Sequence, residues 1–347
     1  MSEKPIGVIG AGSFGSTVAN LLAEKSPVLI YARSKDMIEQ MRAERKSNGY
    51  ILHDNITPVE TLEELATKTE IIFPVVSSAG FRDMMRNLAP YLYPYHTLIH
   101  GTKGLDVTLP EGKSLNDPGI VINRDNVKTM SEVILEESAV VKVGCLAGPN
   151  LAQEIADKHP AATVVASRFD SVIADGQRLL RNDLFQVYGN KDLIGIELAG
   201  VLKNIIAIGS GALSGLGYGE NARALLISRG MIEMIHLGKA LGGNIEAFIG
   251  LAGIGDLMAT CSSSLSRNFT VGNRLAKGET LDEITNSMQE VAEGVHTIKI
   301  IKKFAEHYNF RAPITEKLYQ VLNGKATVKE TLQYLMKIPL NVDIDFL

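Results

Sequence analysis

The stretch Gly10-Ala11-Gly12-Ser13-Phe14-Gly15 decides the fold of the first half of this chain. It directly follows the apolar run Ile6–Ile9 and leads into the helix-like segment Thr17–Glu24. Gly10 permits a tight turn, Gly12 lets the backbone approach a pyrophosphate, and Gly15 lets the helix pack on the strand. The helix N-terminus then faces the phosphates. This strand, turn and helix predict a dinucleotide site, and a glycine turn without a nucleotide is the alternative.

Further along the first half, short β-branched runs alternate with amphipathic segments, which is the pattern of a parallel sheet with crossover helices. The predicted strands are Ile6–Ile9, Val28–Tyr31, Ile71–Val76, Thr97–His100, Val141–Leu146, Thr163–Ala166 and Phe185–Tyr188. The predicted helices are Thr17–Glu24, Lys35–Arg45, Phe81–Leu88, Lys128–Glu136, Leu151–Asp157 and Val172–Leu180. The fold class expected is therefore α/β, with a Rossmann-like, doubly wound parallel sheet.

After Gly195 the strand-like runs end, and the pattern becomes helical. The helices expected there are Ile196–Gly209, Ala222–Leu241, Thr297–Tyr308 and Ile314–Leu322. A chain of 347 residues is long enough for two domains. We expect an NAD(P)-binding domain over residues 1–192 and an all-α domain over 193–347, with Thr108–Asn126 as a surface loop that has no chemistry of its own.

Composition narrows the class of protein. The chain is 45% hydrophobic and 21% charged, which is typical of a globular protein. Its net charge of -4 does not indicate nucleic-acid binding. The start, Met1–Lys4, lacks the order of a secretory signal, and no apolar stretch is long and uninterrupted enough to predict a membrane span. Cys145 and Cys261 form neither a disulfide framework nor a metal pair. We expect a cytoplasmic protein without a metal.

Arg33 indicates which nucleotide is bound. Dinucleotide folds that select NAD place Asp or Glu at the end of the second strand, where it holds the ribose 2'-hydroxyl. This chain has Arg33 there, and a guanidinium suits a 2'-phosphate better than a hydroxyl. NADPH is therefore expected to be favoured, or used alongside NADH. A solvated arginine paired with Asp36 is the alternative.

Two loops follow strands at the edge where ligands of such sheets bind. Lys103 lies in the first, Gly101–Gly104, where an exposed loop lysine is the alternative interpretation. Asn150 lies in the second, Gly148–Ala152, where it is expected to cap a helix N-terminus. A plain capping turn without function explains the second loop equally well.

Lys203 is the best candidate for chemistry, because it stands in the otherwise apolar helix start Ile196–Ile208 and lysine is rarely buried without a purpose. Carbonyl reduction needs a positioned acid: an ammonium can stabilise the charge that develops on oxygen and then deliver its proton. A lysine that extends along an apolar helix edge to reach water is the alternative.

Asp256 and a nearby basic cluster complete the candidate site. Asp256 lies in the apolar, glycine-rich turn Gly253–Cys261, where an unpaired carboxylate would be costly, so a cationic partner is implied. Ser266-Arg267-Asn268 follows, and its donors can clamp a phosphate. A surface Arg-Asn pair is the alternative.

Taken together, these segments resemble the NAD(P)-dependent glycerol-3-phosphate dehydrogenase family over essentially the whole chain. The matching motifs, in the family's order, are Gly10–Gly15, Lys103–Leu105, Gly148–Glu154, Glu197–Asn204, Gly253–Cys261 and Ser266–Asn268. The resemblance implies reversible reduction of dihydroxyacetone phosphate to sn-glycerol 3-phosphate, which supplies the backbone for glycerophospholipid synthesis. Phe14 departs from the family, which often has Trp there, and Thr108–Asn126 looks longer than in many members.

Residue roles follow from the motifs and the resemblance together. Lys203 is expected to donate and accept the proton, with Asn204 and Asp256 beside it. The residues expected at the substrate are Lys103, Gly148, Asn150, Lys203, Asp256, Ser266, Arg267 and Asn268. Those expected at the cofactor are Gly10, Gly12, Ser13, Phe14, Gly15, Arg33, Lys103, Ala152, Arg267, Val291 and Glu293.

Two other functions compete with this interpretation. A two-domain hydroxyacid or phosphogluconate dehydrogenase has the same architecture, but the Ser266–Asn268 motif close to Gly253–Asp256 argues against it. A nucleotide-sensing binding protein would keep the first domain without catalysis. In that case Lys203, Asp256 and Arg267 would have no reason to occur together. The sequence leaves the oligomeric state open, with a homodimer common for such folds.

Overall fold

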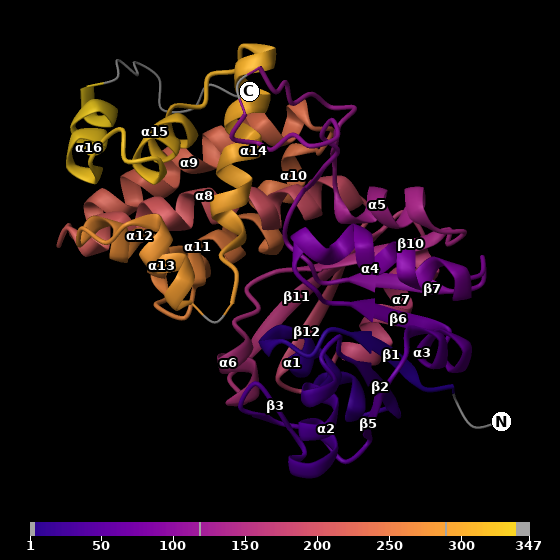
Figure 1. The fold of residues 1–347 in the computed structure, drawn as a ribbon. Coiled ribbons are helices and arrows are strands. Elements are labelled where there is room, and N and C mark those ends of the chain that lie inside the picture. Colours follow the sequence, from indigo (N-terminus) through magenta and orange to yellow (C-terminus); the bar gives the residue numbers. More distant parts are fainter. Residues whose placement is uncertain (1–3, 118, 289, 338–347) are drawn as a thin grey trace. The chain divides into compact units, whose positions relative to one another are not determined.

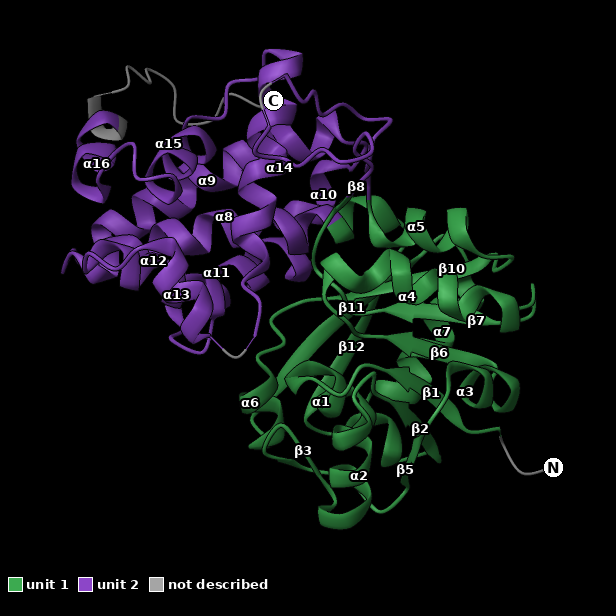
Figure 2. Ribbon diagram, viewed as in Figure 1, with its two compact units in different colours: residues 1–106, 129–197 green, residues 107–128, 198–347 purple. Residues whose placement is uncertain are grey.

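The computed structural model describes residues 4–117, 119–288 and 290–337 (Figure 1). The start of the chain used above to argue against a secretory signal therefore lies mostly outside the described residues. Two compact units are present (Figure 2): unit 1 contains residues 1–106 and 129–197, and unit 2 contains residues 107–128 and 198–347.

An eight-stranded sheet forms the centre of unit 1. In spatial order its strands are β12 (Phe185–Asn190), β11 (Ala161–Ser167), β10 (Lys142–Ala147), β7 (Thr97–His100), β6 (Ile71–Pro74), β1 (Ile6–Ile9), β2 (Val28–Tyr31) and β5 (Ile56–Val59). The six strands from β5 to β10 are parallel, in the order typical of a Rossmann sheet. The α/β fold class predicted from the sequence is confirmed.

The sheet is not parallel throughout, which corrects the sequence-based expectation. β10 and β11 are antiparallel, and β12 runs parallel to β11. The connection between β10 and β11 contains only the five-residue helix α6 (Ala152–Ala156). Such a helix is about 7.5 Å long, whereas six-residue β10 spans about 20 Å. The helix covers less than half of that length, and β11 runs back alongside β10.

Helices cover both faces of this sheet. They are α1 (Ser13–Ala23), α2 (Lys35–Glu44), α3 (Leu62–Lys68), α4 (Phe81–Leu88), α5 (Met130–Glu137) and α7 (Asp170–Leu180). Neighbouring strand residues point to opposite faces. Val8 accordingly packs in one apolar core with α1 and α7, while Ile9 packs in the other core with α3, α4 and α5.

Unit 2 is mainly helical. Its helices are α8 (Leu193–Gly215, which begins in unit 1), α9 (Glu220–Ala240), α10 (Ile245–Ile249), the π-helical turn η3 (Leu251–Gly255), α11 (Asp256–Ser262), α12 (Arg267–Ala276), α13 (Leu281–Ser287), α14 (Glu293–Tyr308), α15 (Pro313–Leu322) and α16 (Val328–Lys337). Among the described residues, α8 is the one helix that by length and composition alone could cross a membrane. Inside the protein, 94% of its most apolar window is buried. This burial is typical of a core helix.

The described residues of Thr108–Asn126 form an irregular and largely exposed loop, as the sequence predicts. They belong to unit 2, and a short ribbon of β8 (Asp106–Val107) and β9 (Val127–Lys128) closes the segment at its two ends. Ile122 is fully buried, and the backbone N–H of Arg124 donates to the Tyr308 hydroxyl of α14 at 3.1 Å. The segment packs on unit 2, where Leu115 and Ile122 are buried. The division at residue 192 misses this excursion.

Candidate active site

The glycine turn after β1 has the close contacts that its sequence predicts. Gly10 has a φ of +113°, and a Cβ there would lie 2.2 Å from the Val75 carbonyl oxygen. A Cβ on Gly15 would lie 2.0 Å from the Gly10 carbonyl oxygen, so α1 can approach β1 only with glycine at this position. Gly12 is the N-cap of α1 and offers no capping side chain. The first turn of α1 therefore has the form of a phosphate cradle.

Sequence reasoning missed two residues that support this turn. The Ser47 hydroxyl donates to the Ala11 carbonyl oxygen at 2.6 Å, and the Asn48 side-chain amide donates to the same oxygen at 3.0 Å. Both lie in a hairpin of two short strands, β3 (Lys46–Ser47) and β4 (Tyr50–Ile51). Asn48 has a φ of 46°, which Asn tolerates better than most residues. The dipeptide Asn48-Gly49, a favoured two-residue hairpin turn, is the signal that could have revealed this hairpin.

Arg33 lies exposed just after β2. Within the described part of the chain it makes no hydrogen bond or ion pair, so the pairing with Asp36 considered above is not formed. Asp36 lies in the first turn of α2, whose N-cap Ser34 accepts the Met37 N–H at 3.3 Å. The guanidinium is thus available to an anion that approaches the end of β2.

Lys103 and Gly148 come together in unit 1, where the Lys103 ammonium donates to the Gly148 carbonyl oxygen at 3.0 Å. Asn150 does not cap a helix as expected: Leu151 is the N-cap of α6, and the Asn150 amide donates to the Thr163 hydroxyl at 2.8 Å. The physical reason is that Thr163 of β11 offers Asn150 an acceptor. Asn150 Oδ1 is buried without a partner in the described structure, which leaves it open to a ligand donor.

Ala152 begins α6, and its carbonyl oxygen lies 3.5 Å from the Thr17 hydroxyl of α1. Phe14 lies in the first turn of the same helix, and a Cβ on Gly101 would be 3.0 Å from the Phe14 ring. These contacts gather Phe14, Ala152 and the Gly101–Lys103 loop around the N-terminal half of α1. Unit 1 thus brings most of its predicted ligand residues to one edge of the sheet.

Lys203 and Asp256 form a buried ion pair in unit 2. The ammonium lies 2.6 Å from Asp256 Oδ1, and the two side chains are 5% and 2% exposed. Asp256 is the first residue of α11, where the helix dipole favours a negative charge. The cationic partner that its burial required is therefore Lys203. Thr260 was missed: its hydroxyl accepts from the ammonium and donates to the Asp256 carbonyl oxygen at 2.6 Å.

Cys261 lies next to this pair and is not a nucleophile. Burial raises the pKa of its thiol to about 12, while the charge of Lys203 acts to lower it. A thiol with that pKa is protonated at neutral pH and does not react readily. Lys203 and Asp256 therefore remain the candidates for chemistry in this part of unit 2.

The cluster Ser266-Arg267-Asn268 opens α12. Ser266 is the N-cap and accepts the Phe269 N–H at 3.3 Å. Arg267 is 48% exposed, lies 3.1 Å from a Glu290 carboxylate oxygen and donates to the Val291 carbonyl oxygen at 3.2 Å. Asn268 Oδ1 accepts the N–H of Gly294 in the first turn of α14 at 2.9 Å. The starts of α12 and α14 are thus tied together.

Two further predicted residues lie in unit 2 close to these contacts. Glu293 is the first residue of α14, and Asn204 is buried on α8. A Cβ on Gly294 would be 2.8 Å from the Asn204 carbonyl oxygen, so α14 approaches α8 closely at this point. Two cavities of about 480 and 510 Å³ lie elsewhere in unit 2, and none of the predicted site residues lines them. Within the described residues, no cluster of His, Cys, Asp and Glu is arranged to hold a metal ion.

Comparisons with known proteins identify the family of this chain. The family model for the N-terminal part of NAD-dependent glycerol-3-phosphate dehydrogenase matches residues 5–172, and the model for its C-terminal part matches residues 192–333. Between them the two models match most of the chain. This chain belongs to the NAD-dependent glycerol-3-phosphate dehydrogenase family.

Individual relatives match this chain over nearly its whole length. Glycerol-3-phosphate dehydrogenase [NAD(P)+] of Pseudomonas putida is 38% identical over 99% of this chain and 97% of its own length. The enzyme of that name from Geobacter sulfurreducens is 38% identical over 99% of both chains. The crystal structure of glycerol-3-phosphate dehydrogenase from Coxiella burnetii has a TM-score of 0.85 and 30% identity, and covers 96% of this chain and 99% of that one. The predicted family is confirmed.

Proposed function

We propose that this chain catalyses the reversible reduction of dihydroxyacetone phosphate to sn-glycerol 3-phosphate with NADPH or NADH. Family membership supports the reaction, and the buried Lys203–Asp256 pair at 2.6 Å carries the assignment of the chemistry. Desolvating two charges costs more than most such pairs return in stability, so a buried pair calls for another explanation. A nucleotide-sensing protein without catalysis would have no use for it.

Lys203 is proposed as the proton donor. When hydride reaches the carbonyl carbon of the substrate, negative charge develops on the carbonyl oxygen, and a nearby ammonium stabilises it. The ammonium then passes a proton to that oxygen, and in the oxidation direction the neutral amine takes the proton from the alcohol. Asp256 and Thr260 fix the direction of the Lys203 side chain. Asn204 is proposed beside it because it follows directly on α8.

The cofactor is proposed to bind at unit 1. Gly10, Gly12 and Gly15, with Ser13 and Phe14 in the first turn of α1, fit a pyrophosphate because the N-cap Gly12 has no side chain to cap the helix N-terminus. Arg33 is proposed to pair with a 2'-phosphate. Further proposed contacts are Lys103, Ala152, Arg267, Val291 and Glu293. A bound nicotinamide nucleotide supplies the hydride.

The substrate phosphate is proposed to bind Arg267, with Ser266 and Asn268. Its charge needs donors that are themselves charged, and Arg267 supplies a planar fork at the start of α12, where the helix dipole also favours an anion. Lys103, Gly148 and Asn150 are proposed to contact the remainder of the substrate. The unpartnered Asn150 Oδ1 can accept a hydrogen bond from a substrate hydroxyl.

These assignments give the two parts of the chain different functions. Residues 1–192 are proposed to bind the cofactor and residues 193–347 to provide the proton donor and phosphate site, with the excursion 107–128 as part of the second unit. We place the enzyme in the cytoplasm, where it supplies glycerophospholipid synthesis and needs no nucleic acid or membrane partner. Sedimentation of the purified protein decides between monomer and homodimer.

The proposed function is tested by following NADPH and NADH oxidation with the purified full-length chain. Dihydroxyacetone phosphate should be reduced, while glyceraldehyde 3-phosphate and small keto acids should give little turnover. Rapid oxidation with keto acids, and none with dihydroxyacetone phosphate, would assign the chain to a different reaction. The same assay compares the two nucleotides.

A further inference from the structure

A buried cluster of three side chains holds the start of α8. Glu197 lies in the early part of this helix, and His100 is the last residue of β7. His100 Nε2 lies 2.9 Å from Glu197 Oε1, and the two side chains are 1% and 3% exposed. The backbone N–H of Ser131 donates to the same carboxylate oxygen at 3.0 Å. All three residues belong to unit 1.

The directions of these hydrogen bonds follow from chemistry. A carboxylate oxygen in its charged form only accepts, and the tautomer of His100 with hydrogen on Nε2 is the one that can donate to it. The Ser131 hydroxyl lies 3.2 Å from the same nitrogen. Ser131 is in the first turn of α5, where the helix dipole favours the negative charge of Glu197. The carboxylate is thus fixed by contacts from a strand and from a second helix.

Stability alone does not explain this cluster. His100 Nδ1 and Glu197 Oε2 are buried without a partner in the described part of the chain. Each such atom has lost its hydrogen bonds to water, and apolar side chains of similar size would avoid that loss. The cluster resembles a buried polar group that is kept for orientation, because its directional bonds permit only one placement of the helix start.

The position of the cluster in the chain suggests what it orients. His100 directly precedes Gly101, whose backbone packs on the Phe14 ring at the proposed cofactor site. Glu197 is the last residue of unit 1 on α8, which continues as one helix into unit 2. Lys203 and Asn204 follow within about two turns of that helix. A helix of this length transmits a rotation or shift of its first turns to the residues beyond.

We propose that Glu197, held by His100 and Ser131, is a positioning residue for hydride and proton transfer. It fixes the first turns of α8, the helix that also carries Lys203, and so orients the Lys203 ammonium for the reaction. This inference rests on the proposed function. Glu197 itself touches neither substrate nor cofactor in this account.

Replacement of Glu197 by alanine tests the proposal. In Glu197→Ala, kcat for dihydroxyacetone phosphate should fall by about 10–100-fold, the scale of a small misalignment of reacting groups. The Kd for NADPH, measured by fluorescence titration, should stay unchanged because the glycine turn is intact. With NADPH deuterated at the transferred position, the isotope effect on kcat should rise, since a slowed hydride step limits turnover more than product release does.

Two further variants separate positioning from folding. Glu197→Gln keeps an oxygen that can accept from Ser131 and His100, so it should restore most of kcat and return the isotope effect towards the wild-type value. His100→Phe keeps a ring in place of the imidazole but removes its donor, and should shift both quantities in the direction of Glu197→Ala. The His100→Phe variant tests the proposal if Glu197→Ala does not fold. A Glu197→Gln enzyme as impaired as Glu197→Ala would overturn the proposal.

Glu233 provides a matched control. It is another buried carboxylate at a helix start, where it accepts the N–H groups of Ile314 and Thr315 at 2.8 and 2.9 Å. Glu233→Ala should lower Tm without raising the isotope effect. If it raises the isotope effect as Glu197→Ala does, the readout reports lost stability and the proposal fails.

The wild-type enzyme separates this inference from the proposed function. If it does not reduce dihydroxyacetone phosphate, the proposed function falls and the inference with it. If it is active and Glu197→Ala keeps both kcat and the isotope effect, the inference alone is wrong.

Discussion

The ammonium of Lys203 is buried next to the Asp256 carboxylate, and this pairing decides what Lys203 can do. A lysine buried without a partner would tend to lose its charge, because desolvation disfavours the charged form. A carboxylate oxygen at 2.6 Å counteracts that tendency. At the scale of the residue, the pair can therefore hold a proton ready for an acceptor.

Lys203→Ala should fold and bind NADPH but lose most of its turnover. Proton delivery typically contributes about 10²–10⁴-fold to a rate, and charge stabilisation adds to that. Steady-state kinetics should show a lowered kcat. Lys302→Ala is the control, because Lys302 of α14 is also paired to carboxylates, of Glu306 and Glu316, outside the proposed site. A Lys203→Ala enzyme with normal kcat and only a raised KM would make Lys203 a binding residue.

Arg33→Asp should shift the cofactor preference from NADPH towards NADH. The exposed guanidinium has no partner in the described structure, and loss of a charge-assisted hydrogen bond to a 2'-phosphate is worth about 1–3 kcal/mol. The ratio of kcat/KM for the two nucleotides measures the shift. Arg42→Asp makes the same charge change on α2, at a residue bound to Glu60, and should leave the ratio unaltered. A wild type that strongly prefers NADH contradicts this role of Arg33.

Arg267→Ala should reduce kcat/KM for dihydroxyacetone phosphate by roughly 2–5 kcal/mol, the range for one partner of a hydrogen-bonded charge pair. Binding energy from the phosphate also orients the carbonyl, so kcat should fall as well as KM rise. Activity on unphosphorylated dihydroxyacetone should change far less. Equal losses on both substrates would instead assign Arg267 to the cofactor or to the Glu290 and Val291 contacts that it makes here.

The sequence predicts the charged members of the site better than the neutral ones. Asp256 in an apolar turn requires a cation, and Lys203 in an apolar helix requires an anion, so each can be found alone and the two fit each other. Thr260, Ser47 and Asn48 carry no such signal, since a hydroxyl or amide is acceptable in many surroundings. Their partners become known only when the chain is folded.

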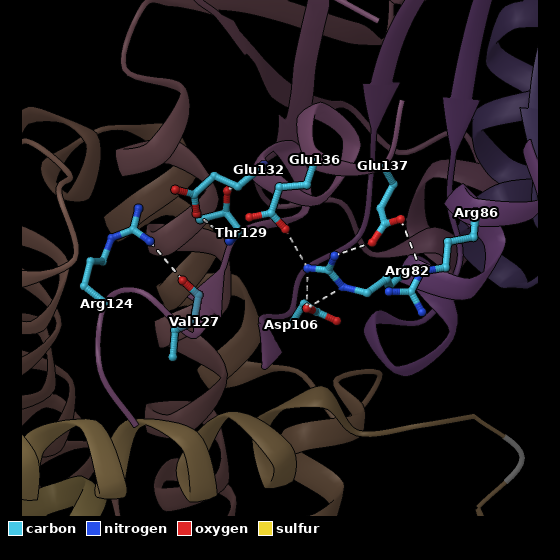
Figure 3. A network of polar contacts seen from close by, with 9 residues as sticks. All are labelled: Arg82, Arg86, Asp106, Arg124, Val127, Thr129, Glu132, Glu136 and Glu137. Carbon is cyan, nitrogen blue, oxygen red and sulfur yellow. Dashed lines mark hydrogen bonds and ion pairs between the residues drawn. The ribbon is translucent and has the colours of Figure 1, made fainter. Parts of the chain in front are cut away.

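At the scale of the elements, Arg82 ties three parts of unit 1 together. Figure 3 shows its guanidinium among Asp106, Glu136 and Glu137, with Nε 2.9 Å from Asp106 Oδ2. Arg82 lies on α4, the two glutamates end α5, and Asp106 is the point at which the chain leaves unit 1 for the excursion 107–128. Burial acts to lower the pKa of Arg82, but the hydrogen bonds to the carboxylates raise it by more.

Arg82→Met should lower the free energy of unfolding by about 1–3 kcal/mol, because it leaves partly buried carboxylates without their donor. Arg86→Met is the matched control on the same helix: Arg86 is 59% exposed and pairs only with Glu137 in the described network. Exposed pairs contribute about 0.2–1 kcal/mol, so its effect should be smaller. Urea denaturation compares the two variants, and equal losses would contradict the assigned role of Arg82.

The same network fixes a pH dependence. Burial acts to raise the pKa of Glu137, and hydrogen bonds from Arg86 and Arg82 lower it by more, to below its ordinary value of 4.5. A carboxyl group with a depressed pKa in the folded state stabilises the fold above its unfolded pKa. That stabilisation is lost as the pH falls below 4.5 and through the folded pKa. The wild type should therefore lose its advantage over Arg82→Met in this acid range.

Most elements were predictable because their periodicity is strong, and the exceptions have physical reasons. The seven expected strands are present, but β5 was missed because Ile56–Val59 is a short edge strand interrupted by Pro58. Helix α3 was missed because only seven residues, Leu62–Lys68, form it. The reversal at β11 depends on the length of the preceding connection, which a strand's own residues do not reveal.

At the scale of the whole molecule, the order of the motifs predicts more than their local patterns do. The excursion 107–128 belongs to unit 2 because side chains such as Ile122 are buried there, and loop-like composition hides this. The family, in contrast, follows from six short motifs in a fixed order along the chain, and the family models match on both sides of the division. The order of motifs along the chain could thus be predicted from the sequence, whereas the packing of distant segments could not.

The proposed function rests on hydride transfer to the C2 carbonyl of dihydroxyacetone phosphate. To test this step, the full-length enzyme is incubated with that substrate and NADPH deuterated at the transferred position, and the product is analysed by mass spectrometry and NMR. We expect sn-glycerol 3-phosphate with one deuterium at C2, and almost none from Lys203→Ala in the same time. Oxidation of the nucleotide without labelled glycerol 3-phosphate, or with the label at another carbon, would contradict it.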